Sequence, residues 1–360
     1  MDIFTMYRLI YQEDLPQDIA PMTDLLQRYS RIPSAEIEAH LHSIRTKAWA
    51  SVRTPCIGRW RFLYSMPASD ARHQLAVQRL KAVFSRDALL DLGCGMGQSL
   101  RQLADAGVPP SRLLGTDIHP AMIDLGFDLF RDRADEPAAP LARVLGRRRL
   151  AMGSRFVVAD LLDDCDAGLK ALGGRFSIVH ASNFWHMFPW LQQIEIAVRL
   201  VSMLKPGTTD ALIYGRQIGR KDADLAPDCS CPHDPAYPFS CAPHDPLSAA
   251  ADCAYLESLA PRSPSISSVS SASTYDSEVA PFSDTSSLAS TVSFSLPSPT
   301  DDQRAFLHNQ KTFQMLWDIV GERTLTRWRV EVDFLSKTTA DLPGFGDDVY
   351  VVHYGVHQLK

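Results

Sequence analysis

The most constraining feature of this 360-residue sequence is the segment Leu89-Leu-Asp-Leu-Gly-Cys-Gly-Met-Gly97, in which an apolar run leads into three alternating glycines. The apolar run predicts a buried strand, and helical spacing follows the glycines. At such a strand-to-helix turn, Gly93, Gly95 and Gly97 would let a ligand approach bare backbone. Gln98 stands where the dinucleotide motif G-x-G-x-x-G needs its last glycine, so the spacing indicates a different ligand.

Six further apolar runs predict a sheet around this strand. They span residues 112–118, 155–161, 176–180, 211–216, 328–334 and 349–356. Helical or polar segments alternate with the earlier runs, and residues 192–204 form the clearest helix. This alternation predicts a Rossmann-like α/β fold, with a mostly parallel seven-stranded sheet and helices on both faces. The last two runs could form an antiparallel hairpin at the sheet edge.

Composition divides the chain into three parts. Residues 1–86 read as an N-terminal helical cap, interrupted where Pro55 and Gly58 break the helical pattern. Residues 87–221 and 303–360 carry the predicted sheet. Residues 222–302 are rich in Ser, Pro, Asp and Ala, and cannot bury enough apolar surface to offset the entropy of ordering. This third part is either a disordered insertion or untranslated sequence retained by gene prediction.

Charge and hydropathy restrict the partners. The formal charge of −6 argues against a protein whose main role is to bind nucleic acid, although five arginines could form a local phosphate-binding patch: Arg143, Arg147, Arg148, Arg149 and Arg155. The sequence contains no run of 18 or more uncharged apolar residues, so we expect no membrane span and a cytoplasmic location. A homodimer is compatible with the sequence.

One cluster of cysteines and histidines could bind zinc. It comprises Cys229, Cys231, His233, Cys241 and His244, which are soft ligands at short spacing. These residues alternate with prolines in an unpatterned segment, which favours a simple loop. We therefore expect no metal site.

Carboxylates follow three of the predicted strands. Asp91 precedes the glycine loop and would repel phosphates, so it favours a cationic ligand. Asp117 ends the second strand and Asp160 the third. Because ligands of open α/β sheets bind at the carboxyl ends of strands, the three acids are expected at one site, where Asp117 could accept hydrogen bonds from ribose hydroxyls. The alternative is that each Asp only caps the next helix.

The segments LLDLGCGMG, GTDI and ADLLDD resemble the successive cofactor motifs of Rossmann-like methyltransferases. The resemblance implies S-adenosyl-L-methionine as the cofactor. It also implies that the loop Gly93–Gly97 contacts the methionine moiety, that Asp117 binds the ribose, and that Asp160 with Leu161 faces the adenine. Ile118, after the second strand, and His180, at the end of the fourth, are expected at the same site.

A narrower resemblance covers most of the chain outside the insertion. The segments TPCIGRWRFL, DLGFDLFRD, IVHASNFWHMFPWLQQ, LKPG, YGRQIG and HNQKTFQMLW are similar to fungal methyltransferases of meroterpenoid biosynthesis. This similarity implies O-methylation of a polyketide-terpenoid intermediate, often of a carboxylate to its methyl ester. The insertion after YGRQIG departs from the family. A methyltransferase-like regulator of secondary metabolism, without turnover of a small molecule, remains an alternative.

The acceptor atom decides which further residues matter. A carboxylate is already ionised at neutral pH, so it needs a clamp rather than a base, and Arg59, Arg61 and Arg216 are the candidates. A phenol or enol would benefit from a general base, for which His186 is the candidate. The loop around His186 is aromatic, with Phe184, Trp185, Phe188 and Trp190, and suits an apolar polycyclic substrate. The family match also makes His308 a substrate-site candidate.

Overall fold

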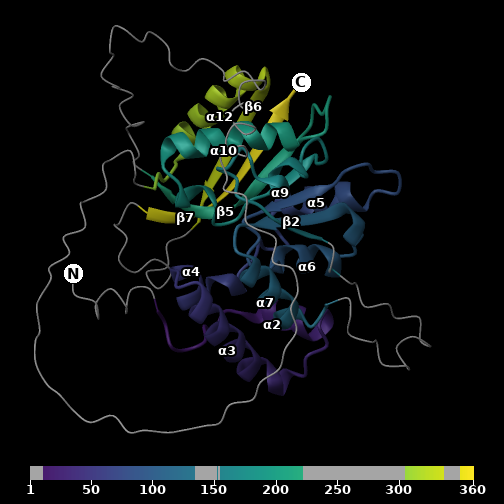
Figure 1. The fold of residues 1–360 in the computed structure, drawn as a ribbon, viewed down its shortest axis with the longest axis vertical. Helices are drawn as coiled ribbons and strands as arrows, with labels where there is room; N and C mark the ends of the chain where they lie inside the picture. The colour runs from purple at the N-terminus through teal and green to yellow at the C-terminus, as the bar shows by residue number, and fades with distance from the viewer. Residues whose placement is uncertain (1–10, 134–151, 153–154, 222–304, 336–348) are drawn as a thin grey trace, which may run out of the picture. The chain divides into compact units, whose positions relative to one another are not determined.

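The computed structural model describes residues 11–133, 152, 155–221, 305–335 and 349–360. Within these residues, seven strands form one sheet of order β3-β2-β1-β4-β5-β7-β6 (Figure 1). The strands are β1 (Leu89–Leu92), β2 (Leu113–Asp117), β3 (Phe156–Val158), β4 (Ile178–His180), β5 (Leu212–Arg220), β6 (Arg327–Phe334) and β7 (Val349–Leu359). β1 to β5 are parallel, and β7 runs antiparallel between β5 and β6. The predicted mostly parallel seven-stranded sheet is confirmed, and so is the antiparallel pair at its edge.

The described helices begin at recognisable signals. They are α2 (Ala20–Arg28), α3 (Ser34–Ser51), α4 (Pro55–Gly58), η1 (Arg61–Leu63), α5 (Ala71–Lys81), α6 (Gln98–Asp105), η2 (Pro110–Arg112), α7 (Pro120–Phe130), α9 (Ala167–Lys170), η3 (Trp185–Met187), α10 (Trp190–Met203) and α12 (Gln310–Thr324). The Asp70 side chain accepts hydrogen bonds from the first backbone N–H groups of α5. Asn309 and Thr312 form a capping box at α12. Such caps satisfy backbone groups that a helix leaves unpaired.

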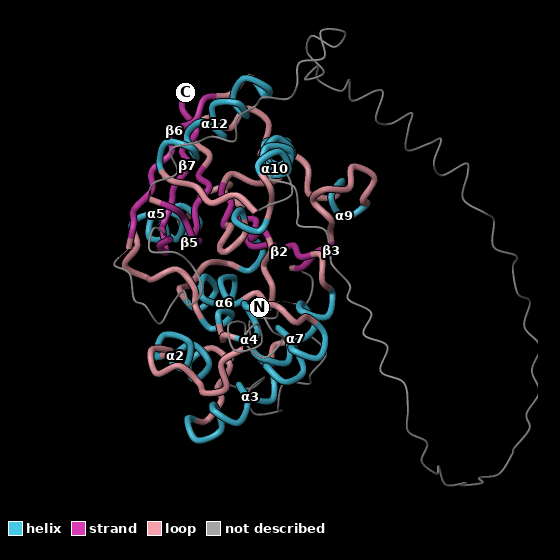
Figure 2. The backbone as a smooth tube through the Cα atoms, turned by 90° about the vertical axis from the view of Figure 1, so that its left-hand side faces the viewer, coloured by secondary structure: helices cyan, strands magenta, loops and turns pink. Residues whose placement is uncertain are grey.

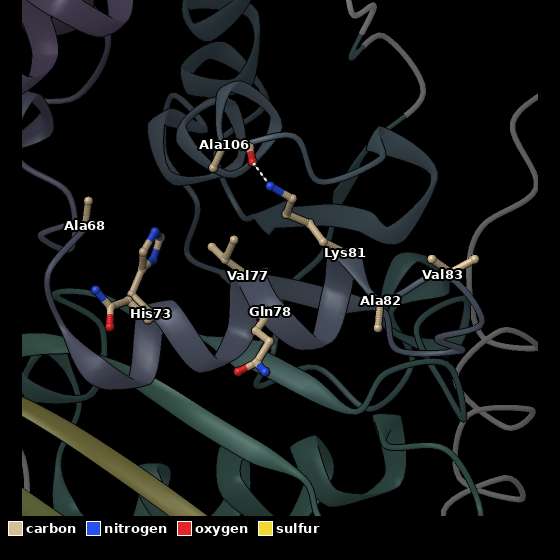
Figure 3. A pocket seen from close by; sticks show the side chains of 9 residues that line it. Ala68, His73, Val77, Gln78, Lys81, Ala82, Val83 and Ala106 are labelled. Carbon is tan, nitrogen blue, oxygen red and sulfur yellow. Dashed lines mark hydrogen bonds between the residues drawn. The ribbon is translucent and has the colours of Figure 1, made fainter.

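Helices α5 and α6 cover one face of the sheet. Their apolar side chains pack with Leu89, Ile178 and Leu212, which share this face. Along α5, His73, Val77 and Lys81 lie on one side of the helix, four residues apart, and line a shallow groove with Ala68 and Ala106, among others (Figure 3). The same helix places His73 against the sheet, where its ring centre lies 6.2 Å from that of Tyr214 in β5.

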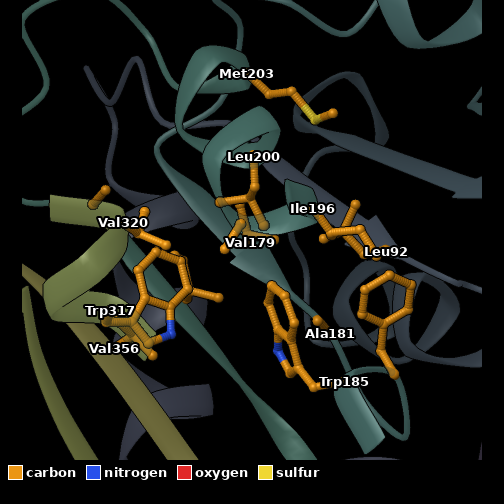
Figure 4. Packing of buried hydrophobic residues seen from close by; sticks show 14 of the residues in the cluster. Leu92, Val179, Ala181, Trp185, Ile196, Leu200, Met203, Trp317, Val320 and Val356 are labelled. Atoms are coloured by element: carbon orange, nitrogen blue, oxygen red, sulfur yellow. The ribbon is translucent and has the colours of Figure 1, made fainter. Parts of the chain in front are cut away.

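Helices α10 and α12 cover the opposite face. Here Leu90, Val179 and Ile213 alternate with the residues of the first face, and they pack against Trp185, Trp317 and other fully buried side chains (Figure 4). The Trp185 indole N–H donates to the Tyr354 hydroxyl at 3.0 Å. Helices thus cover both faces, as the alternation of elements predicts.

The N-terminal helices form a separate apolar cluster. Helices α2, α3 and α4 lie beside α7 (Figure 2), and they bury a set of side chains that includes Met96 of the glycine loop. The predicted break within this region is present: α3 ends at Ser51, and Pro55 begins the short helix α4. The division of the chain at residue 86 stays a prediction. Helix α5, which that division assigns to the cap, packs on the sheet instead.

Several predictions fall outside the described residues. These are the insertion 222–302, the zinc candidates within it, and four arginines of the possible phosphate patch, Arg143 and Arg147 to Arg149. Among the residues that are described, no group of His, Cys, Asp and Glu side chains is arranged to hold a metal ion. In the same part of the chain, no helix is both long and apolar enough to cross a membrane.

Candidate active site

The turn between β1 and α6 has the geometry that its glycines permit. Gly93, Gly95 and Gly97 have φ values of +59°, +53° and +67°, which favour glycine because other residues are strained there. No described atom lies within 4 Å of the position that a Cβ of Gly95 would take, whereas a Cβ on Gly93 would lie 2.8 Å from the Phe184 ring. The loop therefore presents bare backbone to open space at Gly95, and the loop after β4 packs against it at Gly93.

Asp117 orients the glycine loop from the end of β2. Its Oδ2 accepts a hydrogen bond from the Gly95 backbone N–H at 2.8 Å, and its Oδ1 accepts one from the His119 N–H at 2.9 Å. Each carboxylate oxygen keeps a further lone pair for a ligand hydroxyl. The next residue, Ile118, is 51% exposed, so it leaves an apolar surface beside this acid. An oriented carboxylate, an exposed apolar side chain and an open backbone cradle fit a nucleoside attached to an amino acid, as in S-adenosylmethionine.

The third predicted acid lies near the same edge. Asp160 follows β3, and its Oδ1 accepts a hydrogen bond from the Leu162 N–H at 2.9 Å. Leu161 is only 8% exposed and packs in the core beneath α10. The parallel register places β3 directly beside β2, with Val158 paired to Asp117. The assignment of Asp160 and Leu161 to the adenine stays a prediction.

Asp91 and His180 form a buried pair behind the glycine loop. They are register partners on β1 and β4, and Asp91 Oδ1 lies 2.6 Å from His180 Nδ1. Both side chains are less than 5% exposed. On the other side of the imidazole, His180 Nε2 lies 2.8 Å from the Ser182 hydroxyl. The sequence predicts both residues at the cofactor site but says nothing of their pairing or of Ser182.

A second buried ion pair supports the other end of the loop. Arg101, on α6, makes two 2.9 Å hydrogen bonds to Asp132, and its third nitrogen donates to the Met96 carbonyl at 3.0 Å. The hydroxyl of Tyr29, which follows α2, also donates to Asp132 at 2.8 Å. Sequence reasoning missed this network. The available signal was Arg101 on the buried side of α6, among Leu100, Leu103 and Ala104.

Two of the three candidate clamp arginines converge on one aromatic ring. The guanidinium of Arg61, in η1, lies 5.8 Å from the centre of the Tyr64 ring, and that of Arg216, in β5, lies 5.7 Å from it. The Tyr64 hydroxyl donates to Asp18 at 2.6 Å. Arg59 follows α4 and is partly buried. The N-terminal region and the middle of β5 thus bring two cations to one aromatic ring.

The aromatic loop after β4 carries the candidate base. Phe184 and Trp185 are buried, and the Phe184 ring lies 5.0 Å from that of Phe188. His186 Nδ1 is buried without a hydrogen-bond partner among the described residues. Burial disfavours the imidazolium and lowers the pKa of His186 to about 4. A base of that pKa is weak, and no carboxylate of the described chain orients it.

His308 belongs to the core rather than to a substrate surface. It is 1% exposed, its Nε2 lies 2.7 Å from Gln193 Oε1, and its ring stacks on Phe313 at 4.6 Å between centres. With its second nitrogen 3.3 Å from the Thr312 hydroxyl, the ring has no free edge for a substrate. In this structure His308 packs in the core, and its substrate role stays a prediction.

Replacing His308 by glutamine should flatten the dependence of stability on pH. Burial lowers the pKa of His308 to about 3, whereas an unfolded histidine has a pKa of about 6.5. Below pH 6.5 the unfolded chain takes up a proton that the folded chain does not. The stability is therefore complete above that pH and falls by about 1.4 kcal/mol per unit as the pH drops toward 3. Between pH 6.5 and 5, urea titration should show a loss about 2 kcal/mol smaller for the variant than for wild type. Exposed His119→Gln is the control; equal slopes for all three chains would contradict the argument.

The sheet order, the glycine loop and the acid at the end of β2 define an S-adenosylmethionine-dependent methyltransferase. Residues 10–63 match the family model described as the meroterpenoid methyltransferase N-terminal domain. The chain is 35% identical over 209 residues to the asnovolin E/chermesin D methyltransferase nvfJ of Aspergillus novofumigatus (strain IBT 16806), an alignment that covers 57% of this chain and 67% of that protein. It belongs to the fungal meroterpenoid methyltransferase family.

Two other similarities are more limited. The O-methyltransferase atr3 of Stereocaulon alpinum is 34% identical over 213 residues, which cover 59% of this chain and 56% of that protein. Among solved structures, magnesium protoporphyrin IX methyltransferase (ChlM) from Synechocystis PCC 6803 with bound SAH matches 87% of this chain and 97% of its own, at 14% identity and a TM-score of 0.36. A likeness this weak carries no argument, and the fold assignment stands on the observed sheet.

Proposed function

We propose that this methyltransferase esterifies a carboxylate of a polyketide-terpenoid intermediate. The observation that carries the proposal is the convergence of Arg61 and Arg216 on Tyr64 at the carboxyl end of the sheet. Guanidinium groups bind carboxylates through paired, charge-assisted hydrogen bonds, and they hold both oxygens in a fixed orientation. The relative nvfJ, described as a methyltransferase of asnovolin E and chermesin D, supports a meroterpenoid substrate.

The proposed reaction requires the protein to position the substrate carboxylate and does not require a general base. The cofactor, held by the Gly93–Gly97 loop and Asp117, supplies an electrophilic methyl group. Arg61 and Arg216 would hold the substrate carboxylate toward that group, because in-line transfer requires the reacting atoms to be about 3 Å apart. The apolar rings of Phe184 and Phe188 exclude water and match a polycyclic hydrocarbon skeleton.

Arg216→Met should raise the KM for a carboxylic acid substrate by about ten- to a hundredfold, because each charge-assisted hydrogen bond contributes about 1.5–3 kcal/mol. The assay combines methyl-labelled S-adenosylmethionine with a panel of polycyclic terpenoid acids, and methyl esters are detected by mass spectrometry. Arg216→Lys should recover only part of the loss, since an ammonium group lacks the planar fork.

Arg175→Met is the matched control, because Arg175 is exposed and precedes β4 at the opposite end of the sheet. Methyl esters from wild type, with a normal KM in the control, would support the proposal. An unchanged KM in Arg216→Met would show that Arg216 does not bind the acid. Transfer to alcohols or phenols but to none of the acids would refute esterification.

A further inference from the structure

A chain of hydrogen bonds connects β1, the end of β4 and the middle of β5. It runs from Asp91 to His180 at 2.6 Å, and from His180 to the Ser182 hydroxyl at 2.8 Å. The backbone N–H of Arg216 then donates to Ser182 Oγ at 3.2 Å. The side chains of Asp91, His180 and Ser182 are therefore in series, the arrangement by which a carboxylate orients a histidine and the histidine acts on a hydroxyl.

The donors and acceptors in this chain can be assigned. The Asp91 carboxylate offers only acceptors, so His180 Nδ1 carries the proton between them. In the neutral imidazole, Nε2 is then an acceptor, and the Ser182 hydroxyl donates to it. Ser182 Oγ keeps lone pairs, one of which accepts from the Arg216 N–H. Ser182 thus presents an acceptor to any donor that approaches it, and its own proton already points at a base.

Ser182 lies where a substrate oxygen would arrive. It follows β4 by two residues and is partly exposed. Two residues further on, the Phe184 ring lies against Gly93, at the loop proposed to hold the methionine part of the cofactor. On its other side is Arg216, whose guanidinium lies over Tyr64 in the proposed acid clamp. Ser182 is therefore between the cofactor loop and the proposed substrate clamp.

We propose that this chain also methylates hydroxyl groups of the phenol or enol class, with Ser182 accepting the substrate proton and passing its own to His180, which Asp91 orients. This second acceptor class goes beyond esterification, which needs no base. His186, the base expected from the sequence, has no orienting partner among the described residues. His180 has both an orienting carboxylate and a hydroxyl that reaches out of the core.

The proposed transfer balances as follows. The substrate O–C bond forms as the S–C bond of the cofactor breaks, so an uncharged hydroxyl must release one proton. That proton moves to Ser182 Oγ while the Ser182 proton moves to His180 Nε2. His180 becomes an imidazolium paired with the Asp91 carboxylate, and the positive charge is held there until solvent removes the proton. An anion 2.6 Å from Nδ1 stabilises that imidazolium in the buried site.

The titratable groups that face His180 leave Asp91 as its charged partner. They are Asp91 from β1, Tyr214 from β5, whose ring lies 5.1 Å away, and His73 from α5. Burial lowers the pKa of His73 to about 4 and raises that of Tyr214 well above its usual range, so both are uncharged near neutrality. Neither of them therefore competes with Asp91 for the charge of an imidazolium at His180.

Ser182→Ala in the full chain tests the relay. We expect kcat for 2-naphthol and 4-hydroxy-6-methyl-2-pyrone to fall by about 10²- to 10⁴-fold, the usual contribution of a general base. S-adenosylmethionine affinity, measured by calorimetry, should stay within about threefold. Ser182→Thr should restore much of the rate, and Ser202→Ala, at the end of α10, is the control.

A measurement without turnover completes the test. In the 15N spectrum of histidine-labelled protein, the neutral His180 imidazole should carry its proton on Nδ1, beside Asp91, and its Nε2 resonance should shift in Ser182→Ala. The opposite tautomer, or an Nε2 resonance indifferent to Ser182, would overturn the relay. So would a wild-type chain that methylates no hydroxyl substrate, even if it esterifies acids. Hydroxyl methylation that depends on Ser182, without esterification, would support the relay and refute the proposed esterification.

Discussion

Replacing Arg101 by methionine should lower the free energy of unfolding by about 3–5 kcal/mol, because it leaves the Asp132 carboxylate buried without its cation. Arg101 is 0% exposed and Asp132 is 3% exposed, and two hydrogen bonds of 2.9 Å join them. Among the described residues, the Tyr29 hydroxyl would remain as a donor to the acid. Urea denaturation followed by tryptophan fluorescence measures the loss.

Two controls separate burial from charge. Lys47→Met removes one partner of an exposed pair, Lys47 and Asp128 at 3.6 Å, and should cost less than about 1 kcal/mol. The double variant Arg101→Met/Asp132→Leu removes both buried charges and should be more stable than Arg101→Met alone. The double variant could instead lose as much unfolding free energy as Arg101→Met and Asp132→Leu lose together. That result would show that the pair acts through packing rather than through an uncompensated charge.

The same network connects the N-terminal helices to the glycine loop. Tyr29, which follows α2, donates to Asp132, Asp132 accepts from Arg101, and Arg101 donates to the carbonyl of Met96 within the loop. The Met96 side chain in turn packs in the apolar cluster of α2, α3 and α7. The N-terminal region therefore supplies contacts that support the glycine loop. A disturbance of α2 should change the position of the loop backbone.

The central part of the fold was predictable because fully buried parallel strands read as continuous apolar runs. β1, β2 and β4 lie within the predicted ranges, and each ends near a polar residue that the register places at one edge. The positions at which strands end were less predictable. β5 extends to Arg220 because Gln217 and Gly219 pair with β7, and that partner lies more than 130 residues away in the chain. Pairing across such a distance leaves no trace in local hydropathy.

The candidate site likewise contains some residues that the sequence was sufficient to predict and others that it was not. The glycine loop lies within a single strand-turn-helix unit, and Asp117 ends the next apolar run, so local sequence was sufficient to predict their place. The contacts of Ser182 and Arg101 depend on which strands and helices become neighbours. Asp91 meets His180 only because β4 pairs with β1, and Arg101 meets Asp132 only because α7 returns beside α6. These contacts are properties of the assembled fold.

Replacing Asp117 by alanine should weaken S-adenosylmethionine binding by about a hundred- to ten-thousandfold while the protein stays folded. We propose that its carboxylate accepts both ribose hydroxyls, and hydrogen bonds to a charged group contribute about 1.5–3 kcal/mol each, where 1.4 kcal/mol is tenfold in affinity. The variant also loses the 2.8 Å bond that positions the Gly95 N–H. Calorimetric titration with S-adenosylmethionine, and with NAD as the control ligand, measures the effect.

The design of this test separates ribose recognition from loop support. Asp117→Asn keeps one acceptor oxygen, which can still bind the Gly95 N–H, but it loses the charge and the second acceptor, so its affinity should lie between those of wild type and Asp117→Ala. Asp128→Ala, on the exposed side of α7, should bind normally. 2′-Deoxy cofactor binding sharpens the result: if Asp117 holds the ribose, removing that hydroxyl should weaken wild type strongly and Asp117→Ala hardly at all. Near-normal affinity in Asp117→Ala would refute the ribose assignment. If the deoxy cofactor binds wild type and Asp117→Ala with equally weakened affinity, Asp117 only supports the glycine loop and does not bind the ribose.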